Sequence, residues 1–221
     1  QLEYSNQFKE NFILKTFAGF NTRVQKWAVP LSGATESGGP GRKGAPEGIS
    51  NRFGLEIKIK SSKNNFITGI ETILNSGIVK REKISNWLDL NSVSALEEEV
   101  KGKSRLSSIY FLNETSLLKE KITSWIGGRY DSWKNYDGKM STSNETKLFK
   151  DKTVSYFSPK LGVLIKPKSS VLVRMSYGKG FRMPTIHELY RTMIAATSVS
   201  LPNPDLEAEK NTVWDIGVEF N

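Results

Sequence analysis

A two-residue alternation of apolar and polar side chains most constrains what this chain can fold into. In the segment Arg52–Lys60 every second residue is apolar, and the residues between are charged or glycine. The segments Val171–Tyr177 and Trp214–Phe220 alternate in the same way. Successive side chains of a β-strand point to opposite faces, whereas a helix repeats about every 3.6 residues. The pattern therefore predicts strands that have one apolar and one polar face.

Five further segments show a weaker form of the same alternation. They are Asn11–Phe20, Phe66–Leu74, Arg105–Glu114, Lys121–Tyr130 and Val154–Lys166. Together these segments predict about eight strands, most of them near the ~9–11 residues that a tilted strand needs to cross a bilayer. Strands of ordinary globular proteins are shorter, at ~5–6 residues. We therefore predict an all-β fold: an antiparallel, up-and-down transmembrane β-barrel, of which this chain supplies about eight to nine strands.

The predicted connections between these strands alternate between short and long. The short ones are Ser61–Asn65, Thr115–Glu120 and Pro167–Ser169, and the long ones are Asn21–Asn51, Asn75–Ser104, Asp131–Thr153 and Gly178–Asn211. Outer-membrane barrels have short turns on the periplasmic side and long loops outside. A soluble β-sandwich with irregular loops is the alternative, but loops above ~12–15 residues are uncommon in compact domains.

The long connections suggest exposed structure. Leu31–Ile49 is rich in Gly, Ser and Pro, which predicts a flexible exposed segment. Asn86–Lys101 is expected to form a short helix on the outer surface. By length and exposure alone, Asn21–Asn51 and Asn75–Ser104 are the candidates for contact with a ligand or phage.

Charge and cysteine content exclude several classes of function. The chain has 32 Lys and Arg against 23 Asp and Glu, for a net charge of +9, and it has no Cys. The basic residues are scattered through turns and loops and do not interleave with stacking aromatics, so we expect no nucleic-acid partner. The absence of Cys rules out thiol catalysis and thiolate metal sites within the chain. A soluble, basic all-β module that binds an anionic polymer remains the alternative function.

The polar faces of the predicted strands carry both signs of charge, as expected for a hydrated lumen. They bear Glu56, Lys58, Glu71, Arg174, Asp215 and Glu219. Asp215 and Glu219 are ~13 Å apart along one strand face, too far for a glycosidase pair. We find no nucleophile–base set, metal-ligand spacing or phosphate loop. The sequence therefore predicts no enzyme activity, catalytic residue, metal site or cofactor.

Short motifs follow one another in a specific order near the C-terminus. They are Ser158-Pro159-Lys160-Leu161-Gly162, Phe181-Arg182-Met183-Pro184, Glu188-Leu189-Tyr190, Asn203-Pro204-Asp205-Leu206, Glu209, and Gly217 with Glu219. In this order they resemble the barrel of TonB-dependent outer-membrane receptors, in which an FRxP box precedes an ELY-like triplet, a surface loop, an NPxL box and a glutamate. Gly127–Asp131 and Asn65–Glu71 resemble two further strand motifs of that family, with weaker support back to Phe53.

The resemblance implies mainly structural roles for the motif residues. These residues are Phe181, Arg182, Pro184, Glu188, Leu189, Tyr190, Asn203, Pro204, Leu206 and Glu209. Proline cannot donate to a strand ladder, so Pro184 and Pro204 belong at strand exits and turns. Arg182 and Glu209 are expected to pin the loop to the barrel wall or lumen.

The ligand-binding candidates are His187, Arg182 and Tyr190. Haem-transporting members of the family carry a haem-ligating His near this place. It usually follows the ELY-like triplet, whereas His187 precedes Leu189 and Tyr190.

The function implied by the resemblance is energy-coupled uptake of a scarce nutrient across the cell outer membrane, such as a ferric siderophore, haem or cobalamin. The implied partners are outer-membrane lipid, a small nutrient ligand, and an inner-membrane energy-coupling complex that grips a plug segment. The family's barrel has about 22 strands and is filled by a plug. We expect residues 1–221 to be barrel only, without the plug domain. Because Gln1–Tyr4 and Glu219–Asn221 look like parts of strands, we also expect a fragment from the middle of a barrel.

Overall fold

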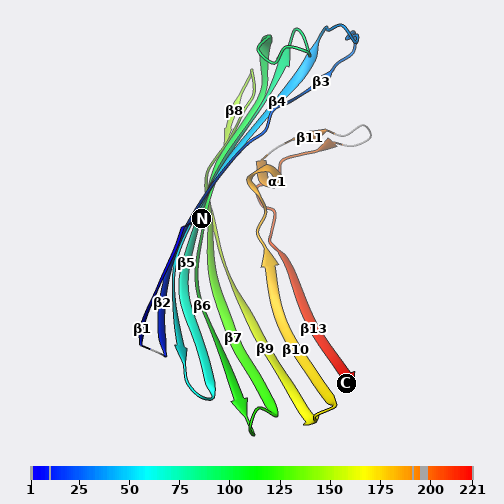
Figure 1. Cartoon of the computed structure of the whole chain (residues 1–221). Helices are drawn as coiled ribbons and strands as arrows, with labels where there is room; N and C mark the ends of the chain where they lie inside the picture. The colour runs from blue at the N-terminus through cyan, green and yellow to red at the C-terminus, as the bar shows by residue number, and fades with distance from the viewer. Residues whose placement is uncertain (1, 10, 191, 195–198, 221) are drawn as a thin grey trace.

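The computed structural model describes residues 2–9, 11–190, 192–194 and 199–220, and almost all of its regular structure is β-strand (Figure 1). The elements are β1 (Leu2–Lys9), β2 (Phe12–Val24), β3 (Trp27–Pro30), β4 (Gly41–Lys60), β5 (Asn64–Ile84), β6 (Val93–Leu117), β7 (Ile122–Ser141), β8 (Thr146–Leu148), β9 (Lys152–Lys168), β10 (Val171–Arg182), α1 (Ile186–Tyr190), β11 (Met193–Ile194), β12 (Val199–Ser200) and β13 (Glu209–Phe220). Gln1 and Asn221, at the ends of the two predicted terminal strands, lie outside the described residues.

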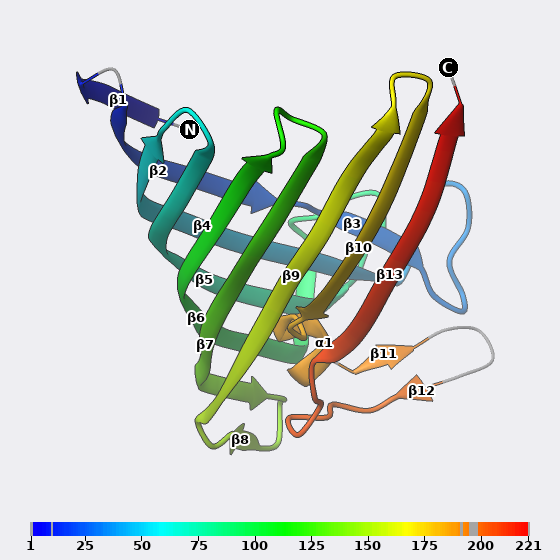
Figure 2. The same cartoon turned by 90° about the horizontal axis from the view of Figure 1, so that it is seen from below.

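Eleven strands form one antiparallel sheet, and nine of them follow one another in the order β1-β2-β4-β5-β6-β7-β9-β10-β13. The short strands β3 and β8 pair with β4 and β7, and β11 pairs with β12 in a separate hairpin. Figure 2 shows that the sheet curves around α1, which lies inside the curve. The predicted up-and-down antiparallel topology is confirmed. In the part of the chain that the structure describes, no helix is long and apolar enough to span a membrane.

The two faces of the sheet differ in chemistry. The pairing register places one set of large apolar side chains on the outer face, turned away from α1, and most of them are exposed: Phe20, Phe53, Ile70, Ile109, Ile126, Phe157, Met175 and Ile216. The inner face carries the charged residues predicted for the lumen, including Glu56, Glu71, Arg174 and Asp215. Because side chains alternate along each strand, this apolar face can meet lipid while the other meets water.

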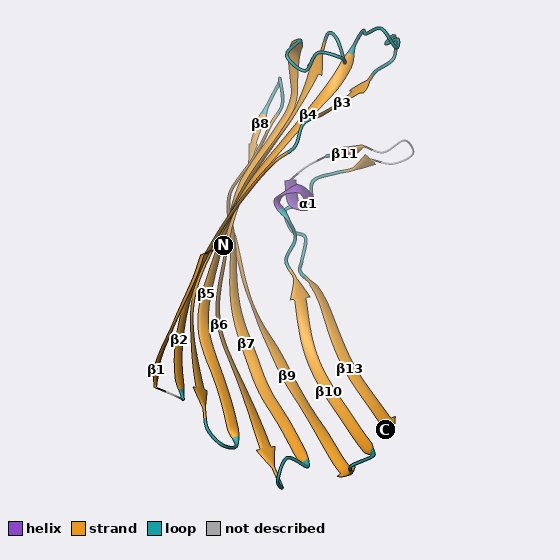
Figure 3. Ribbon diagram, in the orientation of Figure 1, coloured by secondary structure: helices purple, strands orange, loops and turns teal. Residues whose placement is uncertain are grey.

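The connections lie at two different ends of the sheet (Figure 3). Short turns at residues 61–63, 118–121 and 169–170 gather at one end, which confirms the three short links to within a few residues. Connections at residues 25–40, 85–92, 142–151 and 183–208 gather at the other end. The longer connections remain on one side, as predicted for an outer-membrane barrel.

Much of the predicted long loops is strand, which corrects the sequence interpretation. β4, β5, β6 and β7 run for 20, 21, 25 and 20 residues and continue far beyond the alternating segments. These extensions carry charged residues on both faces, as at Lys80–Lys83, so the apolar–polar alternation of the other segments is missing from them. Cross-strand ion pairs hold them instead, with Nζ–Oε2 distances of 2.9 Å for Lys43–Glu82 and 3.4 Å for Lys80–Glu99.

The predicted helix at Asn86–Lys101 is wrong. The Oδ1 atom of Asn86 accepts a hydrogen bond from the backbone N–H of Leu88 at 3.1 Å, which makes a tight turn, and β6 begins at Val93. The segment Leu31–Ile49, predicted to be flexible and exposed, is strand in its second half, where β4 begins at Gly41. The start of β4 pairs with β3 and places Gly44 opposite Trp27.

Substitutions on neighbouring residues of β10 test which face meets lipid. Met175 is 43% exposed on the outer face, and Ser176 beside it faces inward, opposite Asp215. In a lipid bilayer we expect Met175→Arg to lower the free energy of unfolding by ~2–4 kcal/mol, the cost of a cation near the bilayer midplane. Ser176→Arg is the matched control and should cost much less. Urea unfolding in lipid vesicles measures both; equal costs would contradict the assignment of the faces.

Candidate functional site

An ion network lies on the inner face at the level of the apolar outer band. Glu71 and Asp131 are only 5% and 0% exposed, and Arg129 donates to both, at 2.7 Å from Nη2 to Glu71 Oε2 and 2.8 Å from Nε to Asp131 Oδ1. Arg52 also donates to Glu71, and Ser108 donates to Asp131. Two guanidinium groups therefore balance two buried carboxylates, which makes their burial tolerable. The inner face is ionic yet internally neutralised at this place.

The connection between β10 and β13 holds most of the motif residues, and an arginine organises it. Arg182, at the end of β10, donates from Nε and Nη2 to Glu209 at 2.9 and 2.6 Å. It also donates from Nη1 and Nη2 to Glu188 at 3.0 and 2.9 Å. The structure thus brings Arg182, Glu188 and Glu209, which belong to three different motifs, into one ion cluster. Arg182 makes two hydrogen bonds to each carboxylate.

Glu188 also caps the short helix α1. Its carboxylate accepts hydrogen bonds from the N–H and hydroxyl of Thr185 at 2.7 and 2.9 Å, while its own N–H donates to the Thr185 hydroxyl at 3.3 Å. This reciprocal pair is a capping box, which explains why a threonine precedes the glutamate by three residues. The hydrogen bonds from Arg182 are the largest cause that lowers the pKa of Glu188, to about 2. They also lower the pKa of Glu209, and the two carboxylates raise that of Arg182.

Helix α1 packs its last residues into a buried hydrophobic cluster. Leu189 and Tyr190 join Val100 of β6 and Trp133 of β7 in that cluster, and Tyr190 is 1% exposed. The Tyr190 ring stacks on Phe149 with centroids 4.5 Å apart, and its hydroxyl accepts a hydrogen bond from Asn135. The ELY-like triplet therefore joins the ion cluster to the hydrophobic core.

A row of glycines makes room for this helix. Gly48, Gly77 and Gly102 are successive Cα partners across β4, β5 and β6, and Gly138 lies on β7. A Cβ on Gly138 would lie 2.5 Å from the Tyr190 ring. A Cβ would lie 3.0 Å from the Tyr190 ring on Gly102 and 3.4 Å from Ile186 on Gly77, whereas on Gly48 it would approach no residue of α1. Gly77, Gly102 and Gly138 therefore form the seat of α1.

The Asn203–Leu206 box forms a turn that returns the chain to the sheet. Asn203 Oδ1 accepts from the Asp205 N–H at 3.1 Å, and the Leu206 N–H donates to the Asn203 carbonyl at 3.2 Å. Lys152 of β9 donates to the Asp205 carbonyl at 2.9 Å. Leu206 packs against the cluster that holds Tyr190. Pro204 sits inside this turn and Pro184 follows β10, so both prolines lie outside the strands.

A cavity of about 420 Å³ opens between the inner face and the β10–β13 connection. Its walls combine apolar, amide, hydroxyl and basic side chains, among them Arg23, Asn75, Ser104, Trp133, Met183 and His187. Such a mixture suits a small ligand that has both apolar and polar parts. Among the described residues, no group of three or more His, Asp or Glu could hold a metal ion.

The structure separates the three ligand candidates. His187 lines the cavity, whereas Arg182 is engaged by two carboxylates and Tyr190 is buried. Asn75 and Ser104 are the two ends of a predicted loop that was a candidate for ligand contact, but the sequence did not single out either residue. The glycines at matched positions of neighbouring strands were the available signal that something packs closely at this level.

Comparisons with known proteins agree on the architecture. The family described as "TonB dependent receptor-like, beta-barrel" matches residues 1–221. Over 83 residues the chain is 31% identical to the "Probable hemoglobin and hemoglobin-haptoglobin-binding protein 4" of Haemophilus influenzae, covering 38% of this chain and 8% of that protein.

Solved structures of receptors and transporters share this fold at low sequence identity. The ferric yersiniabactin uptake receptor FyuA of Yersinia pestis superposes with a TM-score of 0.67 at 9% identity, covering 99% of this chain and 32% of FyuA. The ferric citrate transporter FecA gives a TM-score of 0.68 at 8% identity, covering 99% and 31%. The chain thus spans about a third of these structures.

Alanine at two glycines tests the seat of α1. Gly138→Ala places a methyl group against the buried Tyr190 ring and should destabilise the full-length receptor by about 1–3 kcal/mol through overpacking. Gly48→Ala is the control in the same row, where a Cβ would meet nothing closer than a backbone oxygen at 3.9 Å. Denaturant unfolding and proteolysis of the β10–β13 connection measure the difference. Equal effects would show that α1 does not rest on the row.

The β10–β13 connection should stay ordered until the pH falls well below the ordinary pKa of a carboxylate. The pKa of Glu188 is lowered from 4.5 to about 2, so its stabilisation is complete above pH 4.5 and is lost as the pH falls toward 2. Amide hydrogen exchange of residues 186–190, corrected for intrinsic rates, should show protection persisting below pH 4. Glu188→Gln, which cannot carry the charge, should show weaker protection already at pH 7. Loss of protection at the ordinary carboxylate pKa would contradict the role of Arg182.

Proposed function

Since the chain belongs to the family of TonB-dependent receptor β-barrels and forms part of an outer-membrane protein, we propose that the receptor built around it imports a scarce nutrient. The ligand class that we propose is an iron-bearing compound, either a ferric siderophore or haem. The support comes from similar proteins whose names state ferric yersiniabactin uptake, ferric citrate transport and haemoglobin binding. Cobalamin is the third ligand class that the resemblance implies, and its uptake is measured in the experiment described below.

The observation that carries this proposal is the opposite chemistry of the two faces. Exposed apolar side chains on the outer face suit lipid, while the inner face holds the network of Arg52, Glu71, Arg129 and Asp131. A soluble module for an anionic polymer would have no use for such an outer band. The charged inner face suits contact with a polar plug, through which we propose that an inner-membrane complex supplies energy.

We place the ligand at the cavity beside His187, on the side of the long connections. This cavity combines apolar walls with hydrogen-bonding groups, and it lies where a ligand arriving from outside would meet the barrel. Arg182 and Tyr190 then hold the connection in position without touching the ligand. We propose transport without catalysis, in keeping with the similar proteins, which are receptors and transporters.

Growth under iron limitation tests this function. Cells that lack their other outer-membrane iron receptors would carry the full-length receptor and receive haem, a ferric siderophore or ferric citrate as the sole iron source. Cobalamin uptake would be measured in parallel. We expect receptor-dependent uptake of one of these compounds, abolished by a protonophore because the transport is energy-coupled.

Uptake that persists with the protonophore would indicate a passive pore, and uptake of none of the compounds would contradict the proposed ligand class. If haem is the ligand, His187→Ala should weaken its binding and alter its absorption spectrum. Asn91→Ala, in the exposed turn between β5 and β6, is the matched control and should change neither.

A further inference from the structure

A cluster of basic side chains lies on the outer face of β6 and β7, above the apolar band. The alternation of side chains puts Lys101, Lys103 and Arg105 of β6 on the same face as the exposed Ile109 and Phe111. Their Cα partners on β7 add two more cations, and the five residues, here called the basic row, are Lys101, Lys103, Arg105, Lys134 and Lys139.

Like charges face each other directly within this row. Lys101 is the Cα partner of Lys139, and Arg105 is the Cα partner of Lys134. Directly opposed like charges destabilise an antiparallel pair. These two pairs, with Lys103 opposite Tyr136 between them, leave a repulsion that an anion between the strands would remove.

Carboxylates of the chain neutralise only part of the row. Asp137 binds Lys103, and Asp151 binds Lys134, each with an Nζ–Oδ2 distance of 2.9 Å. Within the described ranges, Lys101, Arg105 and Lys139 make no ion pair. Glu99, the next outward residue on β6, is already engaged by Lys80 at 3.4 Å. The row therefore keeps a surplus of positive charge.

The row lies beyond the exposed apolar residues Ile109 and Phe111 of β6. Arg105 is four residues beyond Ile109 on β6, ~13 Å along the strand and less along the membrane normal because the strands tilt. Tyr130, the Cα partner of Ile109, is exposed on the same face, as tyrosines at a membrane–water interface are. The basic side chains above it would reach the polar region of the outer leaflet.

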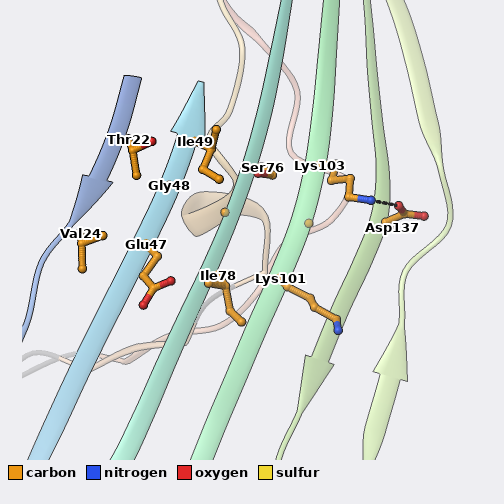
Figure 4. A pocket seen from close by; sticks show the side chains of 12 residues that line it. Thr22, Val24, Glu47, Gly48, Ile49, Ser76, Ile78, Lys101, Lys103 and Asp137 are labelled. Carbon is orange, nitrogen blue, oxygen red and sulfur yellow. Dashed lines mark hydrogen bonds and ion pairs between the residues drawn. The ribbon is translucent and has the colours of Figure 1, made fainter. Parts of the chain in front are cut away.

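A cavity of about 490 Å³ adjoins the row on this face (Figure 4). Val24, Ile49 and Ile78 form its apolar wall, and Ile49 is itself among the exposed apolar residues of the outer face. Lys101 and Lys103 lie at one side of it; Glu47 lies on β4, separated from Lys101 by Ile78 (Figure 4). The cavity thus places an apolar wall next to cations. These two features match the apolar chains and the negatively charged headgroup of an anionic lipid.

We propose that the basic row binds the phosphate groups of a phosphorylated lipid in the outer leaflet, while an apolar part of that lipid lies against Val24, Ile49 and Ile78. Arg105 supplies paired N–H donors that match phosphate oxygens, and the lysines add point charges. Continuity of the cavity wall with the lipid-facing band makes a membrane lipid the occupant, in preference to a dissolved anion.

The test uses the full-length receptor in nanodiscs of phosphatidylcholine, with or without diphosphoryl lipid A. The variant combines Lys101→Gln, Arg105→Gln and Lys139→Gln, and native mass spectrometry measures the retained lipid. Each basic residue near a membrane surface contributes about a fivefold gain in affinity for anionic lipid. We therefore expect roughly 100-fold weaker retention of lipid A by the triple variant.

Three comparisons decide the outcome. The matched control carries Lys63→Gln, Lys119→Gln and Lys168→Gln at the short-turn end, with the same change in charge, and it should retain lipid A like the wild type. Without lipid A the basic-row variant should be at least as stable as the wild type, because it removes opposed like charges. Equal retention by all three proteins, or equal loss in both variants, would overturn the proposal. Stabilisation of the wild type by inorganic phosphate as strong as that by lipid A would overturn the lipid as the occupant.

Discussion

The unbroken antiparallel ladder of backbone hydrogen bonds is the interaction on which the rest of this structure depends. In hydrocarbon each unpaired backbone group costs several kcal/mol, so a strand can lie there only if it is paired. The pleat of paired strands then sends neighbouring side chains to opposite faces. One requirement thus accounts for the exposed apolar outer band and for the inner network of Arg52, Glu71, Arg129 and Asp131.

The sequence predicted the parts of the strands that have one face toward lipid. There every second residue must be apolar, and this alternation is visible in the sequence. It did not predict their continuation beyond the membrane. There charged residues occupy both faces, and the Lys80–Lys83 stretch of β5 is held by ion pairs to partners distant in the sequence. Asn86–Lys101 was mistaken for a helix for the same reason: its polar residues carry no period-two pattern, although the second half belongs to β6.

The candidate site was accessible from the sequence only in part. The resemblance pointed to Arg182, Glu188 and Glu209, but their common ion cluster and the capping box with Thr185 follow from the fold. The seat of Tyr190 depends on glycines and aromatic side chains of β6 and β7, which long connections separate from α1 in the chain. Glycines at matched positions of neighbouring strands signal such a contact, but matching them requires the register of the strands. Nor could the sequence show that cations of β6 and β7 would be opposed, because that depends on register.

The central claim is that alternate residues of these strands face lipid and a polar interior. Residues 1–221 hold no native Cys, so single cysteines can be placed at each position from Val171 to Tyr177 of β10. They would be labelled with a nitroxide in the full-length receptor, with any Cys elsewhere in it replaced. Collision with oxygen, which concentrates in the bilayer, would be compared with collision with a water-soluble nickel chelate. The account predicts high oxygen accessibility at positions 171, 173, 175 and 177 and low accessibility at 172, 174 and 176. Oxygen accessibility without a two-residue period would contradict it.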